Sequence, residues 1–206
     1  MGSVSYWTAP KPVRRARSVA VAELARATRA LLDEGGIPAV TMRGVAQRVG
    51  VAAASLYSRI SSVDDLFDIA LDDALGDDED VWIAAGEDDL RALMLAYYRH
   101  LVVHPWACRV IAMRAPRGPH YLALSDRMCA LLEQRGARDP LGEAYRLSNF
   151  VIGSAVTTPM AQHETLAAVD GSTAPTYAAL HATQSLDPME LVTDGLRVLI
   201  DGVRHR

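Results

Sequence analysis

The side chains of this 206-residue chain that could perform covalent or metal chemistry are two cysteines, six histidines and scattered serines. Cys108 and Cys129 have neither a CxxC spacing nor a His/Cys cluster beside them, which argues against a structural zinc site. Ser55 follows three alanines far from any histidine, and no nucleophile elbow, phosphate loop, HExxH motif or cofactor fingerprint is present. We therefore expect no enzyme activity, no cofactor and no bound metal.

Charge is divided unevenly along the chain. The formal net charge is −4, but residues 1–60 carry +6 and residues 61–206 carry −10. A basic end on an acidic body lets that end approach phosphates while the rest is repelled. Chance clustering is the alternative explanation of this asymmetry.

The sequence also bears on the compartment. Apolar runs such as 101–103 and 198–200 are too short to span a bilayer, and the N-terminus lacks the apolar region of a signal peptide. Two cysteines without paired spacing suit a reducing compartment. We expect a soluble, cytoplasmic protein with no membrane partner.

The segments that carry the basic residues, and those that follow them, all show the periodicity of α-helices. No alternating strand pattern and no fixed-period repeat occurs, so we expect an all-α chain of about nine to ten helices. The acidic stretch 72–80 is interpreted as a solvated linker. The expected helices cover residues 18–34, 41–49, 52–59, 62–75, 88–103, 105 onward, 122–132, 141–162, 177–183 and 188–203. The domains expected are a flexible basic arm (1–17), a helix-turn-helix DNA-binding domain (18–62), and a ligand-binding and dimerisation domain (63–206).

Residues 41–60 have the pattern of a helix-turn-helix. Such a unit needs a capping residue, a tight turn, a small residue where two helices touch, and apolar anchors beneath. Thr41 is the expected cap, Ala46 the helix contact and Gly50 the turn. The anchors are Val45, Val51 and Leu56.

The stretch from Arg14 to Leu71 resembles the DNA-binding end of the TetR family of bacterial repressors. The matching positions are Thr41, Ala46, Gly50, Val51, Leu56, Tyr57 and Leu66. The resemblance implies a short recognition helix whose small residues let the backbone press against the duplex. It implies that Tyr57 and Arg59 meet phosphates and that Arg43 reaches a base edge. The DNA-contacting residues expected are Arg14, Arg15, Arg17, Thr41, Arg43, Ala53, Ala54, Ser55, Tyr57, Ser58 and Arg59.

The chain departs from the family pattern at three positions. Ala52 replaces the usual capping Ser, Arg59 stands where His is common, and Val63 stands where a phosphate-binding Lys is common. Loss of that Lys weakens nonspecific affinity, and Arg59 together with the arginines of the arm could replace it. Ala53 and Ala54 could touch a thymine methyl or act as spacers.

The rest of the chain is similar, more loosely, to the C-terminal region of the tetracycline-repressor subgroup. The segments that carry this resemblance are 104–136, 150–156 and 187–203. The resemblance implies a homodimer built on the last long helices and a pocket for a small molecule. The dimer-interface residues expected are Gly153, Ser154, Val192, Leu196, Leu199 and Val203, although both stripes could instead be intramolecular core.

The pocket is expected to be largely apolar and partly aromatic. Its apolar residues are Tyr97, Tyr98, Leu101, Trp106, Val110, Met113, Met128 and Phe150; its polar residues are His104, Arg109, Asn149, Gln162 and His163. Each of these alone is more often core or cap than a ligand contact. His104 lies near the position of a metal-contacting His in the tetracycline repressor, but Pro105 makes it equally suitable as a helix-entry residue, and its metal role is left open.

The hypothesis is a homodimeric repressor that binds an inverted-repeat double-stranded operator and is released by a small, largely apolar or aromatic effector. The alternative is a ligand-independent DNA binder or adaptor on the same scaffold, and the absence of a void beside Trp106 and Phe150 would favour it. Effector, operator and regulated genes are not indicated by the sequence, nor is repression as against activation. Arg-rich, Lys-poor usage suggests a bacterium with GC-rich DNA.

Overall fold

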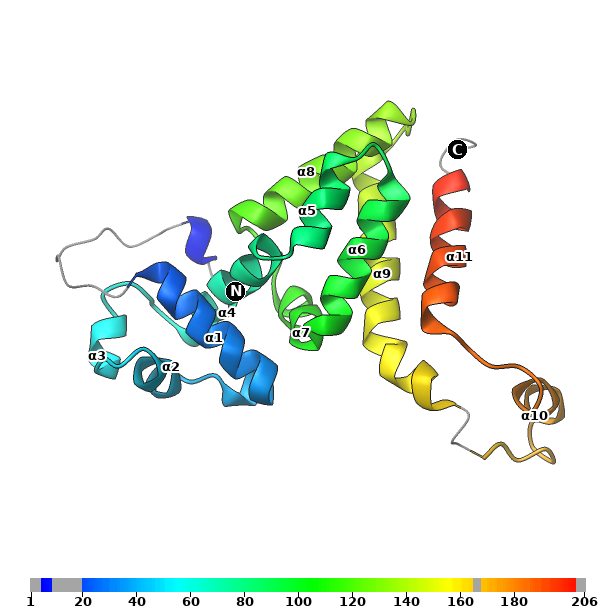
Figure 1. Ribbon diagram of the computed structural model, residues 1–206, viewed down its shortest axis with the longest axis horizontal. Helices are drawn as coiled ribbons and strands as arrows, with labels where there is room; N and C mark the ends of the chain where they lie inside the picture. Colours follow the sequence, from blue (N-terminus) through cyan, green and yellow to red (C-terminus); the bar gives the residue numbers. More distant parts are fainter. Residues whose placement is uncertain (1–4, 9–19, 165–167, 203–206) are drawn as a thin grey trace.

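The computed structural model describes residues 5–8, 20–164 and 168–202. Over these residues the chain forms eleven α-helices, two short 3-10 helices and no strand, which confirms the all-α prediction (Figure 1). The α-helices are α1 (Val21–Gly35), α2 (Met42–Arg48), α3 (Ala53–Leu56), α4 (Val63–Gly76), α5 (Glu79–Gly86), α6 (Leu90–Val103), α7 (Pro105–Met113), α8 (Pro119–Gln134), α9 (Pro140–His163), α10 (Pro175–His181) and α11 (Pro188–Gly202). The 3-10 helices are η1 (Tyr6–Thr8) and η2 (Ile37–Ala39).

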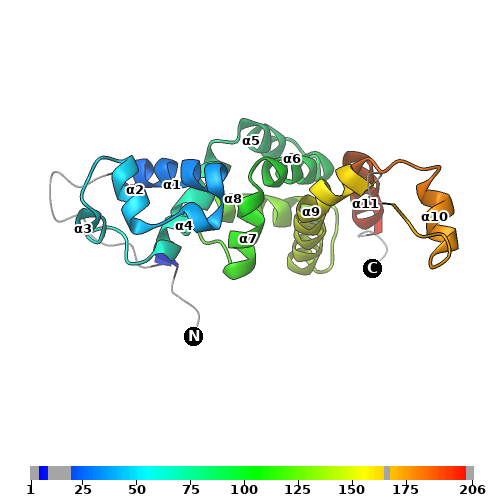
Figure 2. The same cartoon turned by 90° about the horizontal axis from the view of Figure 1, so that it is seen from below.

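Helices α1, α2 and α3 form the head, α5 to α11 form the body, and α4 connects the two. Head and α10 lie at opposite ends of an elongated molecule (Figures 1 and 2). Helix α1 packs along α4, and α2 packs against α3. The head closes on fully buried aliphatic side chains, among them Leu24, Val45 and Leu56.

Helices α6 and α9 form the centre of the body. They pack against each other, α8 packs on α9, and α11 lies against both α9 and α6. Their starts are fixed by aspartates: Asp89 accepts hydrogen bonds from the first turn of α6, and Asp139 accepts one from the first turn of α9. The body core contains the buried side chains Met94, Leu101 and Leu124.

Most of the expected linker at 72–80 is helical, which corrects the sequence interpretation. Helix α4 continues to Gly76, and Asp78 caps α5 by accepting a hydrogen bond of 3.2 Å from the Val81 N–H. Asp72 is buried rather than solvated. The carboxylates that suggested a solvated segment therefore serve as a helix cap and as a buried acceptor, and α5 is a helix that the sequence interpretation missed.

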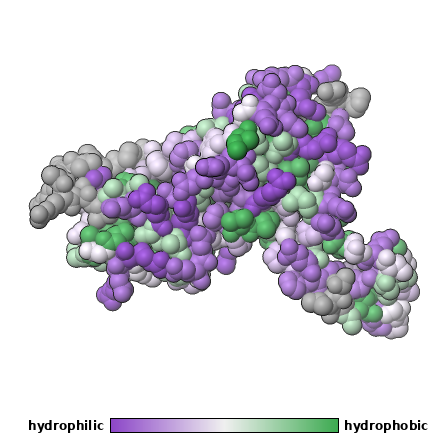
Figure 3. Space-filling model, viewed as in Figure 1, coloured by the Kyte–Doolittle hydropathy of each residue, from purple (hydrophilic) through white to green (hydrophobic). Residues whose placement is uncertain are grey.

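Among the described residues no helix is long and apolar enough to cross a membrane. The face seen in Figure 3 is mostly hydrophilic, with separate hydrophobic areas over the head and the middle of the body.

Candidate DNA interface and ligand cavity

The turn between α2 and α3 has the geometry that its residue types predict. The Thr41 hydroxyl accepts a hydrogen bond of 2.9 Å from the Gly44 N–H and so caps α2. Gly50 has φ +71°, a backbone conformation in the left-handed region that favours glycine. The Val51 N–H then donates to the Ala46 carbonyl at 3.0 Å, which ties the turn to α2. Helix α3 is consequently held at a fixed angle to α2.

Helix α3 presents small residues on its outer side. Leu56 and Ile60 are fully buried and anchor it, whereas Ala54 and Ser55 are exposed. The chain leaves α-helical geometry after Leu56, earlier than the predicted end at residue 59. Tyr57 follows with 54% of its surface exposed. The remaining expected contacts are Arg43 and Ser58, which are exposed, and Ala53 and Arg59, which are half-buried.

Arg59 lies close to the N-terminal segment of the chain. Its positive charge acts on Tyr6, although burial is the larger influence and raises the pKa of that phenol. The Tyr6 N–H donates to Asp68 at 2.8 Å, and Arg114 forms an ion pair with the same carboxylate at 3.3 Å. Arg14, Arg15 and Arg17 lie outside the described residues.

The body contains a cavity of about 620 Å³ between α6, the end of α7, α8 and α9. This volume is within the usual range for small-molecule sites. Of the residues expected at a ligand site, Tyr97, Met128 and Asn149 line it. The other lining residues are Ile111, Ala112, Ala115, Pro116, Arg117, Tyr121, Leu122, Leu124, Ser125, Cys129, Leu141, Ala144, Tyr145, Ser148 and Ile152.

The other expected ligand residues have different surroundings. The Tyr98 and Thr158 hydroxyls share a buried hydrogen bond of 2.7 Å, and a Cβ at Gly195 would collide with the Phe150 ring. Leu101, Trp106 and Val110 are buried without lining the cavity, His104 is half-buried, and Arg109, Met113, Gln162 and His163 are exposed.

Most of the contribution of α8 to the cavity was missed from sequence, where Met128 was the one residue of this helix expected at the pocket. Tyr121, Ser125 and Cys129 follow one another at steps of four, and all three line the cavity. That spacing places them on one helix face. The available signal was this mixed aromatic and small stripe, which lies within a helix expected to start only at residue 122.

His104 and Trp106 lie at a contact between head and body instead of at the cavity. The His104 Nδ1 is 2.9 Å from Asp33 Oδ1, and the Trp106 Nε1–H donates to the same oxygen at 2.6 Å. Asp33 belongs to α1, so these bonds join the end of α1 to the start of α7. No group of three or more metal-ligating side chains occurs within the described ranges.

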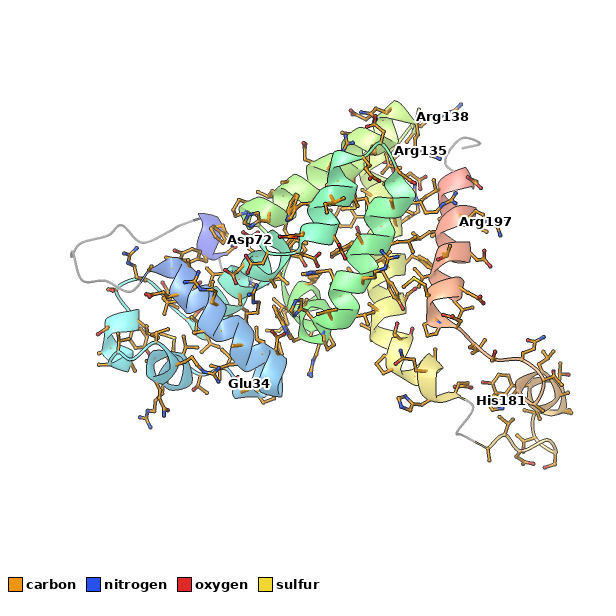
Figure 4. All side chains as sticks on the ribbon, viewed as in Figure 1. Glu34, Asp72, Arg135, Arg138, His181 and Arg197 are labelled. Atoms are coloured by element: carbon orange, nitrogen blue, oxygen red, sulfur yellow. The ribbon has the colours of Figure 1, made fainter. Side chains whose placement is uncertain are left out.

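Asp72 forms a contact between α4 and the body. Its Oδ1 accepts hydrogen bonds from the backbone N–H groups of His120 (2.9 Å) and Tyr121 (3.1 Å). These are the second and third residues of α8, so Asp72, which is labelled in Figure 4, caps α8 from another helix. Its Oδ2 lies 2.9 Å from His120 Nδ1. Burial raises the pKa of Asp72, and these bonds act in the opposite direction.

Close approach of α8 to α4 depends on glycine. A Cβ at Gly118 would collide with the Asp72 side chain, and a Cβ at Gly76 would overlap the His120 ring. The start of α8 is therefore packed directly on α4. Because Tyr121 also lines the cavity, one residue of α8 contacts both the cavity and the helix that leads to the head.

The expected dimer stripe on α11 lies on the inner side of that helix. Val192 and Leu196 are buried within this single chain, where α11 packs on α9 and α6, and Leu199 is half-buried. Ser154 is half-buried and donates to the Phe150 carbonyl, whereas a Cβ at Gly153 would meet open space. Val203 lies outside the described residues.

The outer sides of α9 and α11 carry large exposed apolar side chains. They are Val156 and Met160 on α9, and Leu191 and Val198 on α11. The spacings of four and seven place each pair on one helix face. Figure 4 shows Arg197, next to Val198, on the side of α11 turned away from α9.

Comparison with known proteins finds a matching family model for each of the two parts of the chain. The family model "Bacterial regulatory proteins, tetR family" matches residues 24–69, and the model "Tetracyclin repressor-like, C-terminal domain" matches residues 76–206. A curated "HTH-type transcriptional regulator" of Saccharopolyspora erythraea is 32% identical over 166 residues, which cover 78% of this chain and 70% of that protein.

Two solved structures from Streptomyces coelicolor share the fold. A possible TetR family transcriptional regulator has a TM-score of 0.77 and 26% identity, and the match covers 90% of this chain and 99% of that one. The protein ActR in complex with actinorhodin has a TM-score of 0.71 and 24% identity, over 90% of this chain and 96% of that one.

Proposed function

Because the chain belongs to the TetR family of bacterial regulatory proteins, we propose that it is a homodimeric repressor released from an inverted-repeat operator by a small, largely apolar effector. The chain is a TetR-family transcriptional regulator with a helix-turn-helix DNA-binding domain. Members of the family bind DNA operators and small-molecule effectors and form dimers, and the relatives described above are regulators.

The observation that carries the proposal is the cavity of about 620 Å³ in the body. Neither Trp106 nor Phe150 lines it, so the cavity does not lie where a void was expected from the sequence. Its walls are mostly apolar, as the proposed effector requires. The alternative, a ligand-independent scaffold with a filled body, does not account for a void of this size. ActR, which has the same fold, was solved with actinorhodin bound.

Release requires that the effector bind better to a conformation in which the two heads no longer fit successive major grooves. An effector with equal affinity for both conformations would shift nothing. The route we propose runs from the cavity through Tyr121 and the start of α8 to Asp72, and then along α4 to the head. The contact of Asp33 with His104 and Trp106 gives the head a second attachment to the body.

The test begins with operators selected from random duplex DNA by the purified protein. Thermal-shift screening against antibiotics and lipophilic metabolites then identifies ligands, and each is added to the protein–operator complex. We expect at least one ligand that raises the melting temperature and lowers operator affinity. Ligands that bind without changing operator affinity would contradict effector-controlled release.

Two arginines of the head should affect DNA binding differently. Arg43→Ala should reduce affinity for the selected operator more than for scrambled DNA, since a bidentate arginine–guanine contact contributes about 1–3 kcal/mol of discrimination. Arg59→Ala should weaken binding to both, and should reduce the salt slope by about one. Gel-shift titrations at several salt concentrations measure both effects.

The matched control is Arg48→Ala. Arg48 is also exposed on α2, but it is paired with Glu34 of α1 at 2.5 Å, so its loss should leave operator binding nearly unchanged. Equal losses on all sequences for Arg43→Ala would remove Arg43 from base recognition.

A further inference from the structure

The chemistry of the cavity restricts its ligand further. We infer that the effector is a neutral or anionic rigid molecule that carries a hydrogen-bond acceptor such as a carbonyl oxygen, and that the Tyr121 hydroxyl donates to this acceptor. This inference rests on the proposed function, because it names the ligand class of the same cavity.

The charge of the lining disfavours cations. Among the described residues around the cavity, Arg117 is the only charged side chain, and no aspartate or glutamate is present. A cation entering these mostly apolar walls would lose its hydration without gaining a counter-charge, which is costly. A neutral ligand avoids this cost, and an anionic group at the exposed Arg117 is stabilised.

Tyr121, a residue of the cavity wall, carries a buried hydroxyl that lacks a well-formed hydrogen bond. Tyr97 and Tyr121 meet edge to face with ring centroids 6.3 Å apart, and each hydroxyl influences the ionisation of the other. The two hydroxyls are near enough to act on each other as weak hydrogen-bonding groups, but they do not form a hydrogen bond of ordinary geometry. The buried Tyr121 hydroxyl has no other hydrogen-bond partner among the described residues. Buried polar groups are normally paired, so an unpaired donor beside a cavity indicates a ligand acceptor.

Both phenols remain neutral donors at physiological pH. Burial raises the pKa of Tyr121 well above its usual value and also raises the pKa of Tyr97. A phenolate that could attract a cation or replace the ligand's acceptor is therefore absent from this pair. The backbone N–H of Tyr121 is at the same time fixed by Asp72 at 3.1 Å, so a ligand that engages its side chain acts at the start of α8.

Three probes separate acceptor from charge on rings of similar size. Anthraquinone-2-carboxylate has carbonyl acceptors and a negative charge, anthracene-2-carboxylate lacks the carbonyls, and 2-(aminomethyl)anthraquinone carries a positive charge. Anthraquinones do not undergo the conjugate addition by which simpler quinones alkylate thiols. This matters because Cys129 lines the cavity, although burial raises the pKa of its thiol and so disfavours the reactive thiolate.

Binding is measured by calorimetry on the full-length protein and on three variants. We expect the anionic quinone to bind at least about tenfold more tightly than the cationic quinone. Tyr121→Phe should weaken quinone binding about threefold to tenfold and leave anthracene-2-carboxylate unchanged, because only the hydroxyl is removed. Arg117→Gln should weaken the two carboxylates by up to about fivefold.

The matched control is Tyr145→Phe, which makes the same chemical change at an exposed tyrosine of the cavity rim. It should leave quinone affinity unchanged. Thermal melting of the ligand-free protein adds a second readout: Tyr121→Phe should melt at the same or a higher temperature, since it removes an unpaired buried hydroxyl.

Equal affinity for the cationic and anionic quinones overturns the inference, as does a Tyr121→Phe variant that loses none of the quinone affinity or loses the anthracene equally. Absence of any quinone binding also overturns it. Operator gel shifts with the quinone are scored separately. Binding with the expected preferences but without DNA release contradicts the proposed function and leaves the ligand chemistry standing.

Discussion

Val198→Asp is expected to reduce affinity for a full inverted-repeat operator by about a hundredfold or more. Val198 lies on α11 with 67% of its surface exposed, on the same helix face as Leu191. Val156 and Met160 give α9 a similar exposed apolar face, and Gly153 leaves open space beside them. We propose that these faces pack against a second copy of the chain. An aspartate there would bury an unpaired charge in the dimer.

The large effect on DNA binding follows from linkage of the two heads. When one head is bound, the second head of a dimer binds as an intramolecular step at a high effective concentration. A monomer loses this advantage on every operator, whereas its contacts to one half-site are unchanged. Affinity for an isolated half-site should therefore change little, and that comparison separates loss of dimer from damage to the head.

Ile83→Asp is the matched control. Ile83 is similarly exposed, at 63%, but lies on α5, away from the outer sides of α9 and α11. Analytical ultracentrifugation should find Val198→Asp monomeric and Ile83→Asp dimeric. In gel shifts, Val198→Asp should lose affinity for the full operator and Ile83→Asp should retain it. A Val198→Asp protein that stays dimeric and binds the operator normally would place the interface elsewhere.

The parts of the head that could be predicted depend on local chemistry. Thr41 and Ser62 cap the helices that follow them, because a hydroxyl next to a free backbone N–H is a local arrangement. Gly50 adopts the positive φ that a tight turn requires. Neither feature needs information about distant residues, so both can be inferred from the sequence.

The acidic stretch shows where local chemistry misleads. Asp78, Glu79 and Asp80 stand at the cap and first turn of α5, where carboxylates favour a helix start. Asp72 accepts hydrogen bonds from backbone N–H donors 48 and 49 residues away, at the start of α8. The residue pattern within 72–80 gives no indication of that contact. A buried aspartate that accepts hydrogen bonds therefore cannot be distinguished from an exposed one by the sequence of this segment.

The type of a side chain also does not determine which residues it contacts in the folded chain. Tyr97 and Tyr98 are adjacent on α6, yet Tyr97 lines the cavity and Tyr98 bonds to Thr158. The stripe containing Val192 and Leu196 has helical periodicity. Periodicity shows only that one helix face is buried, and in this structure that face is buried by other helices of the same chain. Which helix packs against such a face depends on the tertiary structure and cannot be inferred from the periodicity.

Asp72→Ala is expected to lower the free energy of unfolding by about 2 kcal/mol, because the backbone N–H groups of His120 and Tyr121 lose their acceptor at the start of α8. For a chain of this size that corresponds to a fall in melting temperature of about 4–8 °C. Gly118, which precedes α8, has no side chain with which to replace the cap. Melting must be compared at one protomer concentration, since dimerisation adds to apparent stability.

Asp72→Asn is the matched variant. Both N–H groups donate to the same oxygen, Oδ1, and an asparagine carbonyl can occupy that place. The amide nitrogen would then face His120 Nδ1 and could donate to it. Since burial raises the pKa of Asp72, removing its charge also removes a desolvation cost. The asparagine variant should therefore stay within about 1 kcal/mol of the wild type.

The effect of Asp72→Ala on the response to a ligand distinguishes two roles of this contact. It either transmits ligand binding from the cavity to the head or only stabilises the fold. If α8 acts on α4 through Asp72, Asp72→Ala should still bind a cavity ligand, but the ligand should change operator affinity by a smaller factor than in the wild type. Asp73→Ala is a comparison and not an inert control, because Asp73 lies next on α4 and pairs with Arg29 of α1 at 3.3 Å, which is itself a contact of α4 with the head. Ligand titrations with and without operator measure this factor directly. An unchanged factor in Asp72→Ala, in protein shown to be folded at the assay temperature, would move the route to another contact, and the bonds of Asp33 to His104 and Trp106 would be the next to remove.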